Sequence, residues 1–130
     1  MDVVKWALDQ GLMTMPKPTD PREILAGQLS RALRQEYSTD KHGRRYRKNH
    51  AVSVYKDGVQ LTIWAILEYA EHEHMEMAFA QRREQIVGDC LQLKTDVDVY
   101  TDMKPERPQI QLPLDFTEDV AEREVYFELA

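Results

Sequence analysis

Residues 71–76 include two histidines and three glutamates, side chains that can bind a metal ion. Glu71 and His74 are three residues apart and His72 and Glu76 are four apart, so each pair would share one face of a helix. Di-metal helix bundles carry a Glu-x-x-His pair on each of two helices, and this chain has no second copy of the pair. Zinc deaminases follow a His-x-Glu motif, here His74-x-Glu76, with a later Pro-Cys-x-x-Cys, which this chain also lacks. We interpret the cluster as the charged, solvated first turn of a helix and expect no metal, with a metalloenzyme as the disfavoured alternative.

The sequence carries no recognisable catalytic signature. Its single cysteine, Cys90, falls on the predicted buried stripe of a helix, where cysteine usually behaves as a small apolar residue. There is no Gly-x-Ser-x-Gly, no His-Glu-x-x-His and no glycine loop for phosphate, and the chain has only five glycines. We therefore predict a protein that is not an enzyme, with no catalytic residues and no cofactor.

Basic residues concentrate between Arg31 and Lys48, where seven of them stand against only Glu36 and Asp40. Arginine side chains pair with phosphate oxygens, and an aromatic ring between arginines can stack on a base. A solvated loop, or a loop that neutralises the acidic half of the chain, would explain the same pattern. We predict a DNA or RNA contact through Arg31, Arg34, Lys41, Arg44, Arg45, Tyr46, Arg47 and Lys48.

The segment from residue 111 to 116 reads Gln-Leu-Pro-Leu-Asp-Phe. It resembles the peptide by which bacterial replication and repair proteins dock on the DNA sliding clamp: a Gln, a Leu three residues later, and a Phe or Leu two further on. The resemblance covers six of 130 residues and assigns no family to the whole chain. It implies a sliding-clamp partner bound through Gln111, Leu112, Leu114 and Phe116. The alternative is a tail that packs these apolar side chains on its own core.

Two helices are predicted in the N-terminal part. Residues 2–12 can form a short helix, and three prolines in the next segment then impose a loop. Asp20 is a good N-cap, Pro21 suits the first helical position, and Glu23 supplies the acid of a capping box. We predict a helix from Pro21 to about Tyr37, followed by a polar, basic connection over residues 38–49.

A β-hairpin is predicted around Asp57-Gly58, the dipeptide that a type I′ turn prefers. Apolar and polar residues alternate on both sides of this turn, from about residue 51 to residue 67. An isolated hairpin is marginally stable in water, so we expect a helix to cover its apolar face.

A long helix is predicted from about Ala70 to Leu93, with a buried stripe that includes Phe79, Ile86 and Cys90. Residues 94–102 fit either a helix or a strand by period alone. Pro105 ends any helix, and a short acidic helix can follow from about Thr117.

These elements predict an α+β fold: two N-terminal helices, a β-hairpin and a long helix, with an acidic extended C-terminal tail. A length of 130 residues suits one core, so we expect a single domain over residues 1–104 and a tail over residues 105–130. The partial seven-residue spacing of the long helix allows a dimer without requiring one, and the oligomeric state stays open.

The charge is divided unevenly along the chain. Residues 1–56 hold 11 basic and 6 acidic side chains, whereas residues 57–130 hold 6 basic and 17 acidic ones. No apolar run is long enough to cross a bilayer and no signal-type cleavage site is present, so we expect a cytoplasmic protein without a membrane partner.

Two functions remain open at this stage. The first is a small non-enzymatic accessory protein of a phage or mobile element, which contacts nucleic acid through a basic helix, loop and hairpin and docks on the sliding clamp through its tail. The second is an acidic inhibitor or interaction protein that occupies the basic, nucleic-acid-binding groove of a partner protein.

Overall fold

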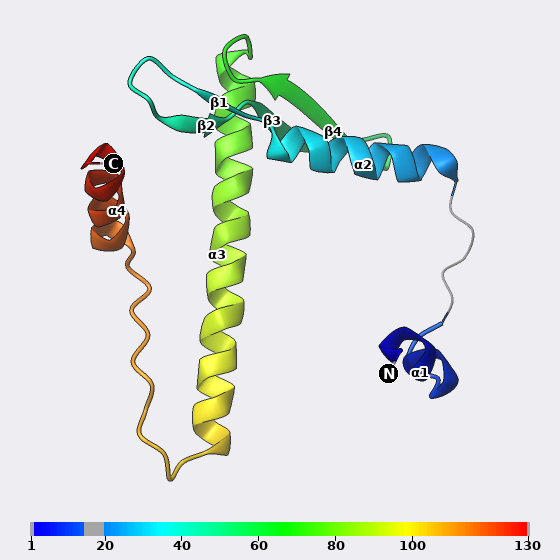
Figure 1. The fold of residues 1–130 in the computed structure, drawn as a ribbon, viewed down its shortest axis with the longest axis vertical. Coiled ribbons are helices and arrows are strands. Elements are labelled where there is room, and N and C mark those ends of the chain that lie inside the picture. The colour runs from blue at the N-terminus through cyan, green and yellow to red at the C-terminus, as the bar shows by residue number, and fades with distance from the viewer. Residues whose placement is uncertain (1, 15–19, 130) are drawn as a thin grey trace. The chain divides into compact units, whose positions relative to one another are not determined.

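The computed structural model describes residues 2–14 and 20–129, which form helices and two antiparallel strand pairs (Figure 1). The helices are α1 (Val3–Asp9), α2 (Pro21–Gln35), α3 (His72–Met103) and α4 (Thr117–Leu129). The strands are β1 (Tyr37–Thr39), β2 (Arg45–Arg47), β3 (Asn49–Lys56) and β4 (Val59–Ile66). The predicted α+β class is confirmed.

Contacts between residues group the chain into two compact units, Met1–Met75 and Glu76–Ala130. The first unit holds α1, α2, the four strands and the first turn of α3, and the second holds the rest of α3 and α4. The predicted boundary between residues 104 and 105 stays a prediction, because this grouping describes contacts and not independent folding.

Helix α2 begins as predicted. The Asp20 carboxylate accepts a hydrogen bond from the Arg22 amide at 2.9 Å, and Pro21 occupies the first turn. The helix ends at Gln35, slightly before the predicted end, because Glu36 adopts an extended backbone. The Glu36 carbonyl then accepts from the Lys48 amide at 3.0 Å, which carries the chain directly into a strand.

The polar, basic connection predicted over residues 38–49 contains a strand pair that the sequence analysis did not predict. Strands β1 and β2 pair there as a short antiparallel hairpin, with Tyr37 opposite Arg47 and Thr39 opposite Arg45. The segment lacks the apolar alternation by which strands are recognised, and backbone pairing with a tight turn forms the hairpin instead.

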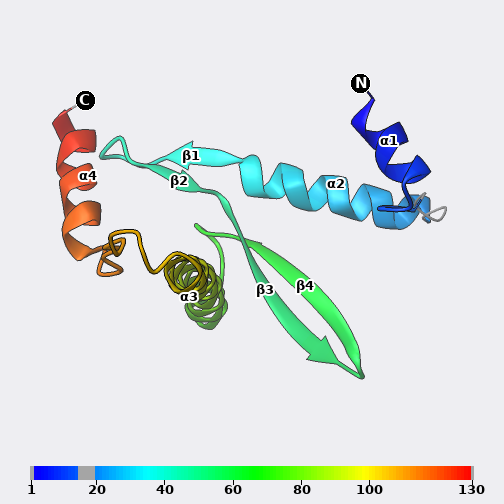
Figure 2. The same ribbon diagram turned by 90° about the horizontal axis from the view of Figure 1, so that it is seen from below.

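The predicted hairpin around Asp57-Gly58 is confirmed as β3 and β4, which pair from Asn49 opposite Ile66 to Lys56 opposite Val59 (Figure 2). Asp57 and Gly58 both have positive φ, 53° and 78°, as a type I′ turn requires. Helix α2 contacts β3, and Val52 of β3 is buried.

Helix α3 runs unbroken through residues 94–102, so the structure selects helix for the segment that period alone left open. Side-chain pairs four residues apart support that choice: Lys94 Nζ lies 2.6 Å from the Asp98 carboxylate, and the Thr95 hydroxyl donates to the Leu91 carbonyl. The helix stops at Met103, two residues before Pro105. The predicted acidic helix at Thr117 is confirmed as α4.

The expected buried stripe of α3 is largely exposed, and Cys90 is only half-buried. Val52 and Ala78 are the buried apolar residues of the described part of the chain. Two-stranded ribbons and single helices offer few inward-facing positions, so these elements leave many apolar side chains in contact with solvent. No helix in the described ranges combines the length and apolarity needed to cross a membrane.

Candidate nucleic-acid interface

The turn between β1 and β2 is closed by Asp40. Its Oδ1 accepts from the amides of His42 and Arg44, both at 2.9 Å, and its backbone carbonyl accepts from Gly43 at 3.0 Å. Gly43 has a φ of 78°, a conformation that glycine adopts without steric cost. The three residues Lys41, His42 and Gly43 thus form the tip of a hairpin that the acid at position 40 organises.

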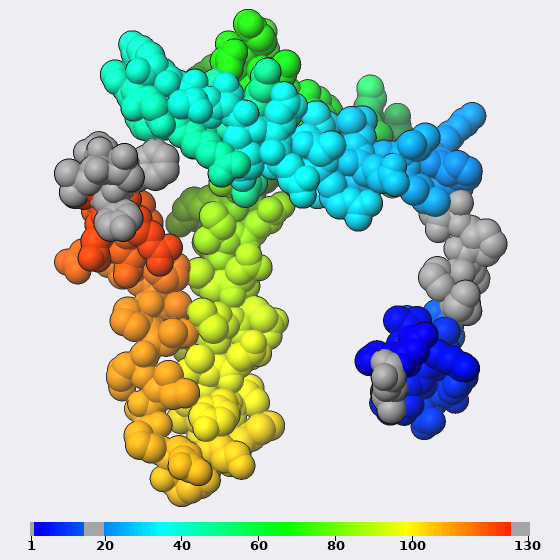
Figure 3. Space-filling view, viewed as in Figure 1, coloured from blue at the N-terminus to red at the C-terminus, as the bar shows by residue number. Residues whose placement is uncertain are grey.

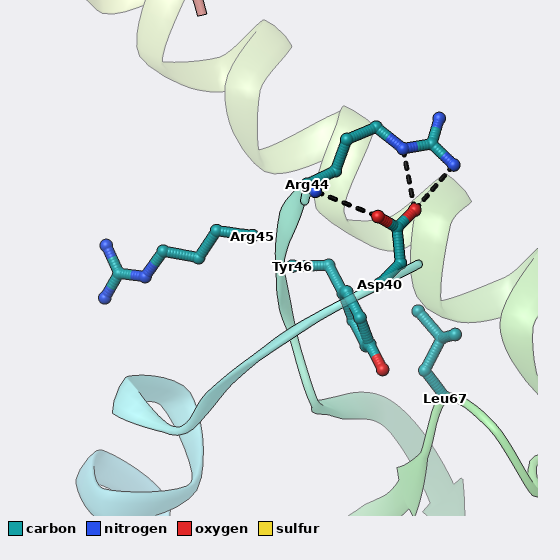
Figure 4. Close-up of a pocket in the computed structure, with 5 residues that line it drawn as sticks. All are labelled: Asp40, Arg44, Arg45, Tyr46 and Leu67. Carbon is teal, nitrogen blue, oxygen red and sulfur yellow. Dashed lines mark hydrogen bonds and ion pairs between the residues drawn. The ribbon is translucent and has the colours of Figure 1, made fainter. Parts of the chain in front are cut away.

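The Arg44 side chain folds back on the same carboxylate (Figure 4). Its Nε and a terminal nitrogen each lie 2.7 Å from Asp40 Oδ2. The hydrogen bonds from the backbone and side chain of Arg44 hold the pKa of Asp40 below its ordinary value. The charge of Arg44 is therefore partly neutralised within the turn.

Arg45 and Arg47 lie on one face of the β1–β2 hairpin, because residues two apart in a strand point to the same side. The partner residues on that face are Tyr37 and Thr39. The Arg45 guanidinium stacks over the Tyr37 ring at 3.8 Å from its centroid and retains its full charge. This face, made of Arg45, Arg47 and Tyr37, is called the arginine face below.

Tyr46 lies on the opposite face of the hairpin, since it alternates with its arginine neighbours. Its hydroxyl donates to Glu68 Oε1 at 2.6 Å, which ties the hairpin to the segment after β4. An open hollow of about 490 Å³ is lined here by Asp40, Arg44, Arg45, Tyr46 and Leu67. In Figure 4 the Arg45 side chain points away from Arg44 and Asp40.

Of the remaining predicted basic residues, Arg31 and Arg34 lie on α2, Lys41 lies at the tip of the β1–β2 hairpin, and Lys48 lies between β2 and β3. Arg34 of α2 lies over the Trp64 ring at 5.8 Å, and Lys48 pairs with Glu36 at 3.6 Å. Within residues 2–14 and 20–129, Arg31 and Lys41 form no ion pair, and both are exposed. The surfaces of α2 and of the β1–β2 hairpin are continuous in Figure 3.

Sequence reasoning missed the polar residues that hold this unit together. Asn49 is buried, and its Nδ2 donates to the Leu33 carbonyl at 3.1 Å and to Glu36 Oε2 at 3.2 Å. The Leu33 carbonyl is one of the last of α2 and has no partner within the helix, so Asn49 caps α2 from the neighbouring strand. No local pattern could have indicated this bond, because its partners are 16 residues apart.

Two histidines form a second link. His50 Nε2 lies 2.8 Å from the Arg47 carbonyl, and His74 Nε2 lies 3.0 Å from the His50 carbonyl, so both rings donate from Nε2. His74 thereby joins the first turn of α3 to β3. Among the described residues, no group of three or more histidine, cysteine or acidic side chains is arranged to hold a metal ion.

The segment from Gln111 to Phe116 has no regular secondary structure and connects α3 to α4 along the chain. Gln111, Leu112 and Phe116 are exposed, whereas Leu114 is half-buried. A hollow of about 460 Å³ begins at this segment and is lined by Pro113, Phe116, Asp119, Val120 and Arg123.

Asp115 connects this segment to α4. Its Oδ1 accepts from the Thr117 hydroxyl at 2.7 Å and from the Thr117 amide at 3.1 Å. These bonds lower the pKa of Asp115, the side-chain bond most strongly. The last residues of the segment are therefore fixed to the start of α4.

Comparisons with protein-family models, with curated proteins and with solved structures gave no match.

Proposed function

We propose that this protein is a small non-enzymatic accessory factor, of the kind encoded by phages and mobile elements, that acts in DNA transactions. It contacts nucleic acid through the β1–β2 hairpin and α2, and it docks on the sliding clamp through residues 111–116. The observation that carries the first part is the arginine face, where exposed Arg45, stacked on Tyr37, and half-buried Arg47 lie on the same side of the hairpin.

Several features favour a phosphate-binding role for this face. Two guanidinium groups on one side of the hairpin can contact neighbouring phosphates, and the Tyr37 ring stacks against the guanidinium group of Arg45. Arg31 and Lys41 add charge on the continuous surface of α2 and the hairpin. Arg44 and Lys48 contribute less, because Asp40 and Glu36 already pair with them.

The tail supports the second contact through its conformation. An extended peptide places Leu114 and Phe116 on the same side, and Pro113 stiffens the chain and lowers the entropy cost of binding. Gln111, Leu112 and Phe116 are exposed in the single chain, so a partner can reach them without unfolding α4.

Titration against a bacterial sliding clamp tests the docking. We expect saturable binding with a micromolar dissociation constant, lost in Gln111→Ala and in Phe116→Ala. Ile110→Ala is the matched control, because Ile110 is an exposed apolar neighbour outside the motif, and it should bind as the wild type does. Binding that ignores the first two substitutions, or no binding, rejects the clamp as partner.

Salt-dependent DNA binding tests the hairpin. For duplex DNA, the slope of log affinity against log salt falls by about 0.9 per lost phosphate contact. The double variant Arg45→Gln, Arg47→Gln should therefore lower the slope by about 1.8. The double variant Arg83→Gln, Arg107→Gln removes the same charge outside the basic segment and should leave the slope unchanged. Failure of the wild type to bind DNA at low salt rejects this contact.

The acidic second unit favours one other function. Residues 76–130 hold 13 acidic and 6 basic side chains, a net charge of −7. Such a unit could occupy the basic, nucleic-acid-binding groove of a partner protein and exclude the nucleic acid. Salt-sensitive capture of a basic partner, released by competing DNA and combined with no clamp binding, would favour this role.

A further inference from the structure

The C-terminal half of α3 carries exposed apolar residues with a seven-residue repeat. Ile86, Leu93 and Tyr100 recur at this spacing and are 52%, 44% and 44% exposed. Cys90 and Val97 follow the first two by four residues and are half-buried. These five residues are called the heptad stripe below, and Phe79 continues the same spacing one repeat earlier.

This spacing is that of a coiled coil, in which apolar residues alternate at positions a and d of a heptad. Ile86, Leu93 and Tyr100 take position d, and Cys90 and Val97 take position a. A β-branched residue at a beside a leucine at d, as at Val97 and Leu93, favours two parallel strands. Arg83 occupies the preceding a position, so the uninterrupted apolar contact begins at Ile86.

Charges beside the stripe select the partner and its orientation. Asp89 lies at position g and Lys94 at position e, five residues later. In a parallel, in-register pair the g residue of one helix faces this e residue of the other, so two Asp89–Lys94 pairs form between copies. An antiparallel pair that superposes Ile86 on Val97 would instead bring Asp89 near Asp96, a repulsive contact.

Lys94 can serve both copies. Within one chain its Nζ lies 2.6 Å from Asp98, and an ammonium group has three donors. The intrahelical pair therefore need not break when Asp89 of the second copy approaches.

We propose that α3 pairs with α3 of a second copy as a parallel, in-register two-stranded coiled coil from Ile86 to Tyr100. The occupant of the exposed stripe is thus the same chain, and the dimer covers apolar side chains that a single chain leaves in water. This inference is independent of the proposed function. If both hold, each particle carries two arginine faces and two tails, and binding gains from linkage of the two sites.

Light scattering after size exclusion tests the dimer with the full chain. We expect twice the chain mass of 15.3 kDa for the wild type. Leu93→Lys should raise the dimer dissociation constant by at least about 100-fold, because each dimer loses two buried leucines. Leu91→Lys is the matched control: Leu91 is 65% exposed, lies off the stripe on the same helix, and should leave the dimer intact.

Circular dichroism keeps this comparison interpretable, since both variants must retain helix content at concentrations where the wild type is dimeric. A wild type that stays monomeric at millimolar concentration overturns the proposal. Equal dissociation of the dimer by both substitutions also overturns it, because the contact would then not follow the stripe.

Disulfide formation between the Cys90 residues of two copies tests whether the two helices are parallel and in register. Facing Cα atoms in a pair of helices are about 3.4–5.4 Å apart, from axes about 8–10 Å apart and a Cα radius of about 2.3 Å, and this range overlaps the spacing of about 4.4–6.8 Å in disulfides. That separation suits a disulfide, so diamide should convert the wild type to a covalent dimer through Cys90 and leave Cys90→Ser unlinked. A non-covalent dimer that diamide fails to link overturns the parallel, in-register arrangement.

Discussion

Replacement of Asn49 should weaken the packing of the end of α2 against β3 and lower the stability of the protein. Asn49 is 8% exposed, and its side-chain amide donates to the Leu33 carbonyl at 3.1 Å and to the Glu36 carboxylate at 3.2 Å. In Asn49→Ala both bonds are lost, and the Leu33 carbonyl at the end of α2 stays without its partner.

The expected loss follows from the two bonds. A neutral amide–carbonyl bond contributes about 0.5–1.5 kcal/mol and a bond to a charged group about 1.5–3 kcal/mol. The Glu36 side chain is half exposed, so water replaces part of the second bond and the lower end of that range applies. We expect Asn49→Ala to lower the free energy of unfolding by about 2–3 kcal/mol.

Asn49→Asp sharpens this test at almost the same volume. Its carboxylate cannot donate a hydrogen bond and would face the Leu33 carbonyl oxygen and the Glu36 carboxylate. At neutral pH we therefore expect Asn49→Asp to destabilise the protein more than Asn49→Ala does. Part of this loss should be recovered as the pH falls and the carboxylates take up protons.

Urea unfolding followed by the fluorescence of Trp64 measures these differences. Arg34 of α2 lies 5.8 Å over the Trp64 ring, so the signal reports the contact between α2 and β4. A Trp6→Phe background removes the other tryptophan of the chain. Gln60→Ala, at an exposed position of β4, is the control and should change stability by less than about 0.5 kcal/mol. An Asn49→Ala midpoint equal to that of the control would refute the role of Asn49.

Three further predictions concern the β1–β2 turn and the start of α4. Hydrogen bonds from Arg44 lower the pKa of Asp40 below its ordinary value of 3.8, so the ionised carboxylate stabilises the hairpin above pH 3.8. This contribution is lost as the pH falls through the lower pKa of the folded state. The NMR chemical shift of the Arg44 amide should follow this titration in the wild type and not in Asp40→Asn. Gly43→Ala should destabilise the hairpin by about 1 kcal/mol, because φ is 78° there, with the loss visible as faster amide exchange in β2. The hydrogen bonds from Thr117 lower the pKa of Asp115, so α4 should fray in the wild type as the pH falls through that lowered pKa. Circular dichroism of Asp115→Ala should show the frayed state at every pH.

Local signals predicted the element starts and turns well. The Asp20-Pro21 start of α2 and the Asp57-Gly58 turn both appear as predicted, because each depends on residues within four positions of one another. The end of α3 before Pro105 follows from the same kind of short-range steric rule.

The candidate site could be predicted only as a list of residues. The basic segment was identified, but its division into an arginine face and a Tyr46 face depends on the β1–β2 pairing, which the sequence reading missed. Asp40 pairs with Arg44, so Arg45 and half-buried Arg47 are the arginines of β2 that share one face of the hairpin.

By itself, the sequence determined the class of the fold, the starts of its helices and the concentration of basic and acidic residues in different halves. Only the tertiary structure decided that Asn49 caps α2, that His74 ties α3 to β3 and that the stripe of α3 faces solvent. The physical reason is the sequence separation over which each interaction acts. Capping, turn and helix signals act within a few residues, whereas burial and hydrogen bonding between distant residues exist only after the chain has folded.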